Sequence, residues 1–272
     1  MKYHISKKLK IPSNIIININ ILRRSIDARK KNNLKFNFTI TARINGKIPQ
    51  HPDITEYKPP KPYLKFAKQI SDLQPFIIGT GPAGLFAALS MVEKGFKPYI
   101  FDRGDEIEKR AKKVSKFWEK CILDEESNVQ FGEGGAGTFS DGKLTTRTRD
   151  FYTDKVIDYL IEFGADEKIK YKALPHLGTD GIRKIVLNIR GYLEEKGCKF
   201  FWRHKLQDIQ IQNGKIASVN INKQTFNPEI LILAIGNSAR DTFEMLSQKI
   251  SLENKPFAIG VRIEHLQDYI NQ

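Results

Sequence analysis

Three glycines at fixed spacing follow a short apolar run in the first third of the chain. Phe76-Ile77-Ile78 ends directly at Gly79, and Gly81 and Gly84 follow before an apolar, helix-like stretch over 85–94. In this context the first glycine permits a tight turn, the second lets the backbone approach a pyrophosphate, and the third lets helix and strand pack closely. The alternative is an ordinary strand–turn–helix with incidental glycines. The pattern predicts a dinucleotide-binding loop with contacts from Gly79, Gly81, Pro82, Ala83 and Gly84.

An acidic residue and a later apolar run indicate which dinucleotide this loop binds. Asp102 ends a strand-like run over 98–101, in a position where a carboxylate accepts a hydrogen bond from a ribose hydroxyl. Asp102-Arg103-Gly104 resembles the ending of that strand in flavoproteins, and 230–236 resembles their later Ala-Thr-Gly strand, with Ile235 in place of Thr. Either stretch alone could be a core strand and a turn. Together with the loop they favour FAD, with contacts from Asp102, Arg103, Ala234 and Gly236.

A second glycine-rich segment spans Phe131–Leu144 and holds five glycines within 11 residues. Such a segment forms neither a stable helix nor a stable strand, but it can bring backbone N–H groups close to an anion or a flat ring. The alternative is a flexible surface loop, which the Phe, Thr, Ser and Asp residues between the glycines argue against. We expect further cofactor contacts here from Gly134, Gly135, Gly137, Thr138, Ser140 and Lys143.

These motifs and three others together resemble the uncharacterised FAD-dependent dehydrogenases, also called NAD(FAD)-utilizing dehydrogenases. The three others are 21–31, His176-Leu177-Gly178-Thr179-Asp180 and 260–265. The resemblance implies a Rossmann-like FAD-binding fold of the glutathione-reductase class and an oxidoreductase activity, and it implies no substrate. Family members look about twice as long, so the chain resembles their N-terminal portion. The later segment that contacts the ribityl chain in related flavoproteins is not among these residues.

Four side chains are candidates for the chemistry, namely Lys143, Ser140, Asp141 and His176. Lys143 could lie near the electron-rich side of a reduced flavin, or it could be a structural or phosphate contact. His176 could be structural or could face a substrate, and Asp180 after it could cap the following helix. We assign no catalytic residue. NAD(P)H is one candidate electron donor, although a second G-x-G-x-x-G motif for a separate NAD(P)H domain is not visible in the sequence.

Positive charge is concentrated at the start of the chain. Residues 1–72 hold 16 Lys/Arg and 4 Asp/Glu, whereas residues 73–272 hold 29 and 27. We expect strands over 15–19 and 36–42, a turn at Asn45-Gly46 and a short basic helix over 22–31. That helix would carry Arg23, Arg24, Arg29, Lys30 and Lys31. It could contact nucleic acid, or it could cover an acidic edge of the rest of the protein.

The composition and the element pattern predict an α/β protein of two domains. Prolines crowd 49–62, so we expect a small basic α+β domain with a Pro-rich linker over 1–60. The FAD-binding domain would span 61–272, with the start of a substrate domain near 256–272. Further helices are expected over 105–120, 152–163 and 180–196, and strands over 199–202, 206–211, 215–221 and 230–234.

The remaining features narrow the class of protein. Cys121 and Cys198 lie far apart, so neither a disulfide framework nor a metal cluster is expected. The early apolar stretch over 15–22 is interrupted by asparagines and is shorter than a membrane span, and a cytoplasmic protein is expected. The leading hypothesis is an FAD-dependent oxidoreductase. A nucleic-acid-associated FAD protein and a non-catalytic nucleotide-binding remnant stay open as alternatives.

Overall fold

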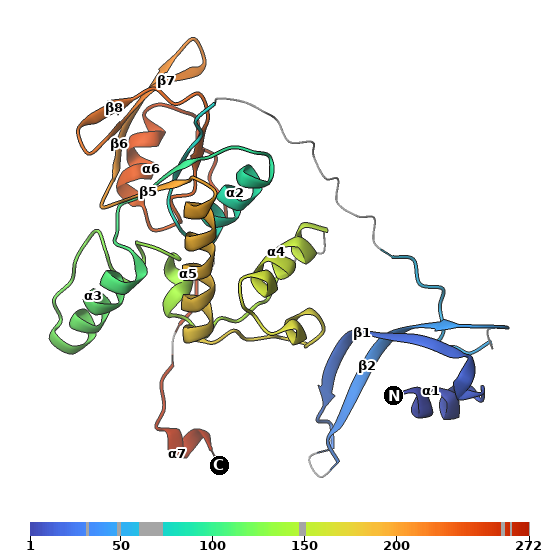
Figure 1. Ribbon diagram of the computed structural model, residues 1–272. Coiled ribbons are helices and arrows are strands. Elements are labelled where there is room, and N and C mark those ends of the chain that lie inside the picture. Colours follow the sequence, from blue (N-terminus) through green and yellow to red (C-terminus); the bar gives the residue numbers. More distant parts are fainter. Residues whose placement is uncertain are drawn as a thin grey trace.

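Figure 1 shows the computed structural model, which describes residues 1–30, 33–47, 50–59, 73–146, 151–256, 259–261 and 263–271. Several residues with predictions lie outside these ranges, namely Lys31, Pro49, Pro60, Pro62, Arg262 and nearly all of 63–73. The described part of the Pro-rich linker, 50–59, contains neither helix nor strand. The division into two domains stays a prediction.

A four-stranded parallel sheet forms the centre of the larger part of the molecule. Its strands lie in the order β5 (Lys199–Trp202), β4 (Tyr99–Asp102), β3 (Phe76–Ile78) and β9 (Leu231–Leu233). All three residues of β3 are buried. Burial on both faces explains why this strand reads as a continuous apolar run, because helices and a second sheet cover a parallel sheet from both sides. The predicted strands at 98–101, 199–202 and 230–234 are confirmed to within one residue at each end.

Helices cover one face of this sheet and a small antiparallel sheet covers the other (Figure 1). The helical layer consists of α2 (Pro82–Glu93), α4 (Phe151–Glu162) and α5 (Thr179–Glu195), which share a core with Ile77 and Ile100. The opposite layer consists of β6 (Leu206–Gln212), β7 (Lys215–Ile221), β8 (Gln224–Phe226) and α6 (Arg240–Ser247). Successive strand residues point to opposite faces, so Phe76 and Ile78 belong to this second core.

The connecting elements agree with the predicted pattern. The segment after β4 is α3 (Ile107–Lys120), and the three-residue and four-residue turns are η1 (Ser13–Ile15), η2 (Ala136–Phe139) and η3 (Glu167–Lys170). The predicted helices over 85–94, 105–120, 152–163 and 180–196 are confirmed as α2, α3, α4 and α5. Asn213 and Gly214 both have positive φ between β6 and β7, as a two-residue hairpin turn requires. A short helix, α7 (Gln267–Ile270), lies near the end of the chain.

The N-terminal part differs from its prediction in two elements, an additional helix and a strand in place of a helix. It consists of α1 (Lys2–Leu9) and two long antiparallel strands, β1 (Ile16–Asp27) and β2 (Lys35–Ile44). The strands expected over 15–19 and 36–42 are confirmed, but the basic helix over 22–31 is wrong, because β1 continues through Asp27. Pairing with β2 along the whole of β1 overrides the local helix preference of Leu22, Arg23 and Arg24.

Candidate functional site

The first glycine-rich segment forms a tight turn between β3 and α2. Gly79 has φ +105°, and a Cβ there would lie 2.2 Å from the carbonyl oxygen of Ala234. A Cβ on Gly84 would lie 1.9 Å from the carbonyl oxygen of Gly79. Both neighbours are backbone atoms, which cannot move aside as a flexible side chain does. These contacts give Gly79 and Gly84 the close-packing roles that the motif predicts, and they place the chain after β9 directly against the loop.

The two glycine-rich segments contact each other at the start of α2. The N–H of Gly134 donates to the carbonyl oxygen of Thr80 at 2.9 Å. Gly135 has φ +66°, and a Cβ there would lie 3.0 Å from Cα of Gly81 and 3.2 Å from Cδ of Pro82. Gly81 itself precedes α2 without a side-chain cap, so the first N–H groups of the helix lack partners within it. Backbone atoms and the Pro82 ring therefore line the contact between segments that lie about 50 positions apart in the sequence.

Asp102 fixes the loop through its carboxylate. Its Oδ2 accepts hydrogen bonds from the N–H of Thr80 at 2.8 Å and from the Thr80 hydroxyl at 2.5 Å. Its Oδ1 accepts from the N–H of Gly104 at 2.8 Å. Both side chains are buried, Thr80 completely. Thr80 was not predicted as a site residue, although its place between two glycines of the motif was a signal for it.

Arg103 belongs to a cluster of four charged side chains beside the loop. Its Nε lies 2.6 Å from Glu126, its Nη1 lies 3.0 Å from Asp241, and its guanidinium lies over the ring of Phe131. Lys205 completes the cluster, with its Nζ 2.8 Å from Glu126 and 2.6 Å from Asp241. Hydrogen bonds from Arg103 hold the pKa of Asp241 well below its usual range. Sequence reasoning missed Glu126, Lys205 and Asp241, because they come from distant segments.

A buried arginine holds the turn that leads into the second glycine-rich segment. Arg110 of α3 is fully buried and donates to the carbonyl oxygens of Asn128 at 2.8 Å, Val129 at 2.9 Å and Glu133 at 2.5 Å. Burial lowers its pKa to about 10, so the guanidinium stays charged at neutral pH. A Cβ on Gly132 would lie 2.7 Å from Cδ of Arg110, so a larger residue at this position would collide with the buried arginine side chain.

Glu133 is a buried carboxyl group inside the same segment. Its Oε2 accepts from the N–H of Ile107 at 2.7 Å and lies 3.2 Å from Nη1 of Arg190. Its Oε1 has no hydrogen-bond partner among the described residues. Burial raises the pKa of Glu133 to about 7. A charged residue type between glycines was the only sequence signal for this group, and it was not predicted.

The remaining predicted residues of the segment are exposed except for Thr138. Thr138 is fully buried and its hydroxyl donates to the carbonyl oxygen of Glu133 at 3.3 Å, whereas Gly137 and Ser140 are exposed. Lys143 is exposed, and its Nζ lies 3.1 Å from Asp141. Gly236, at the other side of the loop, is exposed with φ +75°.

The structure brings the two candidate chemical motifs together. Lys143 and His176 lie opposite each other in an antiparallel bridge. The N–H of Leu177 donates to the carbonyl oxygen of Gly142 at 2.9 Å, and the Thr179 hydroxyl donates to that of Ser140 at 3.0 Å. Directly opposite residues of an antiparallel pair project to the same side, so both basic side chains share one exposed surface. The predicted cap at Asp180 is wrong, because α5 begins at Thr179 after Gly178, without a side-chain cap.

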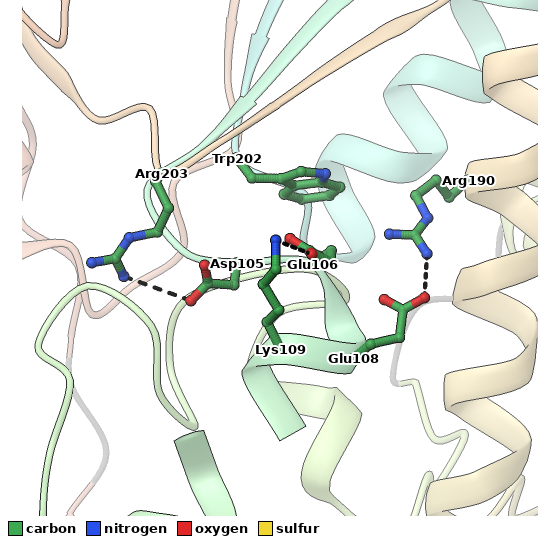
Figure 2. Close-up of a pocket in the computed structure, with 7 residues that line it drawn as sticks. All are labelled: Asp105, Glu106, Glu108, Lys109, Arg190, Trp202 and Arg203. Carbon is green, nitrogen blue, oxygen red and sulfur yellow. Dashed lines mark hydrogen bonds and ion pairs between the residues drawn. The ribbon is translucent and has the colours of Figure 1, made fainter. Parts of the chain in front are cut away.

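A surface pocket of about 600 Å³ lies between the start of α3, α5 and the end of β5 (Figure 2). Figure 2 shows its charged side chains paired with one another: Arg190 with Glu108, Lys109 with Glu106, and Arg203 with Asp105. Trp202 of β5 completes the lining. Two of the lining residues contact Glu133 of the second glycine-rich segment. The carbonyl oxygen of Asp105 accepts the N–H of Glu133 at 3.1 Å, and Nη1 of Arg190 lies 3.2 Å from its Oε2. None of the predicted cofactor-binding residues lines it.

Among the described residues, no helix is long and apolar enough to cross a membrane. The same residues contain no group of three or more His, Cys, Asp or Glu side chains that could hold a metal ion. Cys198 is buried, and burial raises the pKa of its thiol to about 11, whereas Cys121 is exposed.

The structure is that of an α/β protein with a parallel sheet and a glycine-rich turn after the first strand of that sheet. Residues 1–43 match a domain of unknown function, DUF8436. The chain is 43% identical over 278 residues to an uncharacterized protein of Clostridium beijerinckii, and the match covers 98% of this chain and 51% of the relative. The chain therefore spans about half the length of this curated relative. Because the relative is itself uncharacterized, the family expected from the motifs stays a prediction.

Solved structures with similarity to the chain are distant. L-amino acid deaminase from Proteus vulgaris has a TM-score of 0.41 at 12% identity, with 67% of this chain and 59% of that chain covered. THI4 from Thermovibrio ammonificans has a TM-score of 0.43 at 16% identity, with 66% and 64% covered. An FAD-dependent pyridine nucleotide-disulphide oxidoreductase from Desulfovibrio vulgaris has a TM-score of 0.30 at 16% identity, with 62% and 27% covered. Similarity at this level does not assign a function to the chain.

Proposed function

We propose that this chain is the FAD-binding part of an oxidoreductase. The observation that supports the proposal is the contact between the two glycine-rich segments at the start of α2, where only backbone atoms and the Pro82 ring line the approach. A pyrophosphate needs such a site, because its oxygens require close N–H groups and leave no room for side chains. The site also lies at the carboxyl end of β3, where open parallel sheets bind their ligands.

Different residues would contact different parts of the cofactor. Gly81 and Ala83 would face the pyrophosphate with N–H groups, while Gly79 and Gly84 shape the turn. Gly135 would border the pyrophosphate with its Cα only, because its N–H donates to the carbonyl oxygen of Gly132 at 3.0 Å. Asp102 would accept from the adenosine ribose through the one lone pair left on its Oδ1, while Thr80 and Gly104 keep the carboxylate in place. Arg103 and its charged cluster would lie along the adenosine. Ala234 and Gly236 would border the cofactor from the chain after β9.

Lys143 and His176 would form the substrate-facing surface. Lys143 belongs to the second glycine-rich segment, and His176 lies just before the N-terminus of α5. Because α5 leads back to the start of β5, its N-terminus lies at the carboxyl end of the sheet, on the same side as the loop. When bound, FAD would supply hydride transfer to or from a small molecule, and the basic side chains would orient an electron-rich group. NAD(P)H is the electron donor to test first.

The cofactor site is tested by one substitution with a matched control. Gly81→Trp places a large side chain against Gly135 and should abolish FAD binding, because a Cβ at Gly81 already points toward Cα of Gly135 at 3.7 Å. Gly191→Trp is the control, since a Cβ at this exposed position of α5 meets nothing within 4 Å. The measurement is the flavin absorption retained after incubation of the purified chain with FAD and gel filtration. Equal flavin in both variants would contradict the placement of the site.

The oxidoreductase assignment needs a separate measurement. Anaerobic addition of NADH or NADPH to the FAD-loaded chain should bleach the flavin absorption if the chain accepts these donors. Dithionite bleaches any accessible flavin and serves as the positive control. Failure of FAD binding would refute the whole proposal, whereas binding without reduction by either nucleotide would refute only NAD(P)H as the donor for this chain.

A further inference from the structure

The N-terminal hairpin combines a high positive charge with an exposed aromatic face. Residues 1–47 contain 12 Lys/Arg and a single carboxylate, Asp27, which corresponds to a net charge of +11. That carboxylate is occupied by Arg29, whose Nε and Nη2 lie 2.8 Å and 2.6 Å from its two oxygens. The described residues of this region therefore offer no free negative group. A surface of this charge attracts polyanions.

The register of the hairpin places its aromatic residues on one face. Arg24 pairs with Phe38, and Ile26 pairs with Phe36, so these four side chains point to the same side. The rings of Phe36 and Phe38 lie 6.3 Å apart. Both are open to solvent, at 59% and 45% exposure. The opposite face carries only polar residues such as Asn37 and Thr39.

A second element extends this face. The N–H of Arg24 donates to the carbonyl oxygen of Tyr171 at 2.6 Å. The carbonyl oxygen of Arg24 in turn accepts a hydrogen bond from the N–H of Ala173 at 2.9 Å. The Arg24 guanidinium carbon lies 5.4 Å from the ring centre of Phe36 and 5.8 Å from that of Tyr171. Figure 1 shows the hairpin beside the loop after α4 that carries Tyr171. We call Arg24, Phe36, Phe38 and Tyr171 the Arg24 surface.

We infer that the Arg24 surface binds single-stranded nucleic acid. Unpaired bases stack on exposed aromatic rings and on guanidinium planes, whatever their sequence. Phosphates between the bases are matched by the surrounding positive charge, which includes the exposed Lys30 in the hairpin turn and the exposed Lys172 beside Tyr171. A duplex keeps its bases inside the stack and cannot use the rings, so the surface favours single strands over duplexes.

The charge complementarity selects this partner over a second copy of the chain. Two hairpins with a net charge of +11 each would repel one another, whereas a polyanion releases counterions on binding. The inference does not depend on FAD binding. None of the four residues has a described contact with the loop over 79–84, which is the phosphate loop of the proposed function, or with the second glycine-rich segment.

The test measures fluorescence anisotropy of short labelled oligo(U) and oligo(dT) on addition of the full chain. Binding to either strand, weakening as salt rises from about 50 to 200 mM, is expected. Phe36→Leu with Phe38→Leu should weaken binding at least about tenfold, because stacking contributes about 1–3 kcal/mol per base. Phe36→Tyr with Phe38→Tyr should restore it. Phe243→Leu, at an exposed phenylalanine of α6, is the control and should leave binding unchanged.

Charge is tested by a second matched pair of variants. Lys30→Gln with Lys172→Gln should reduce the salt dependence, with the slope of log K against log salt concentration falling by about 1.4 for two phosphate contacts. Lys112→Gln with Lys116→Gln removes the same charge from exposed positions of α3 and should leave the slope unchanged. Preference for oligo(U) over oligo(dT) would identify RNA as the partner, and equal affinity would identify single strands of either kind.

Three results would overturn the inference. The first is the absence of any anisotropy change at low salt with both oligonucleotides. The second is binding that heparin displaces equally well from the wild type and the leucine double variant, which would indicate ion exchange without stacking. The third is self-association of the chain in light scattering that the leucine double variant abolishes, which would make a second copy the partner. Circular dichroism of each variant reports whether it is folded.

Discussion

Glu133 is the residue whose surroundings depart furthest from those of an ordinary glutamate. It is completely buried, one carboxylate oxygen has no partner among the described residues, and its pKa is raised to about 7. The other oxygen accepts from Ile107 and lies near Arg190. These two interactions only partly offset the free energy of burying the charged form. The residue therefore makes the segment beside the phosphate loop sensitive to pH.

The sign of this effect follows from linkage. In the unfolded chain Glu133 has a pKa near its ordinary 4.5, whereas the folded protein binds the proton more tightly, with a pKa of about 7. The free energy of unfolding should therefore fall by about 3 kcal/mol as pH rises from about 4.5 through 7. Glu133→Gln should remove most of this fall, because the amide stays neutral and its oxygen still accepts from Ile107.

Urea unfolding at pH values on either side of this range measures the prediction. Glu125→Gln is the matched control, since Glu125 is exposed and lies in the same connection between α3 and the glycine segment. The control should retain the pH dependence of the wild type. A Glu133→Gln variant with the same pH dependence as the wild type would contradict the assignment.

At the scale of elements, α3 and the second glycine-rich segment form one unit through Arg110. The guanidinium bonds carbonyl oxygens of Asn128, Val129 and Glu133, and the next residue, Gly134, bonds the phosphate loop. A planar group with several fixed donors can bridge carbonyls that point in different directions. The glycine segment is thus positioned by a helix that does not itself contact the loop.

Arg110→Lys tests this role. Lysine keeps the charge but cannot reach three carbonyl oxygens in a plane, so at least two buried acceptors lose their donors. The free energy of unfolding should fall by about 2–4 kcal/mol. The affinity for FAD should fall as well, because Gly134 and Gly135 lose their support. Lys116→Arg on the exposed side of α3 is the control for both measurements, and an unchanged FAD affinity in Arg110→Lys would refute the positioning role.

At the scale of the whole molecule, the phosphate loop joins parts of the chain that are distant in sequence. It contacts the segment after β4, the glycine segment before α4 and the chain after β9. A ligand that binds these three segments at once should stabilise the native state of the larger part as a whole. FAD at about a hundredfold excess over its Kd should add about 2.7 kcal/mol to the free energy of unfolding.

Differential scanning fluorimetry with increasing FAD measures this stabilisation as a rise in Tm. AMP, which carries the adenosine and one phosphate, is the comparison ligand and should give a smaller rise. The Gly81→Trp variant should show no response to FAD. An equal response of this variant and the wild type would place the binding elsewhere in the molecule.

Much of the fold could be predicted because its signals are local. The apolar run before Gly79, the glycine spacing, the Asn213-Gly214 turn and four helices could each be predicted from a few neighbouring residues. The basic stretch over 22–31 could not, since its conformation depends on pairing with β2 across the hairpin turn. Propensity is a weak preference, and ten cross-strand partners outweigh it.

The phosphate loop was determined by the sequence alone, because a Cβ at Gly79 or Gly84 would collide with backbone and only glycine fits. The meeting of Gly135 with Gly81, the charged cluster around Arg103 and the burial of Glu133 were decided by the tertiary structure. The physical reason is that each of these features joins residues separated by 50 positions or more, or depends on what covers a side chain. No local pattern carries that information, and only the order of the strands and the packing of α3 and α5 supply it.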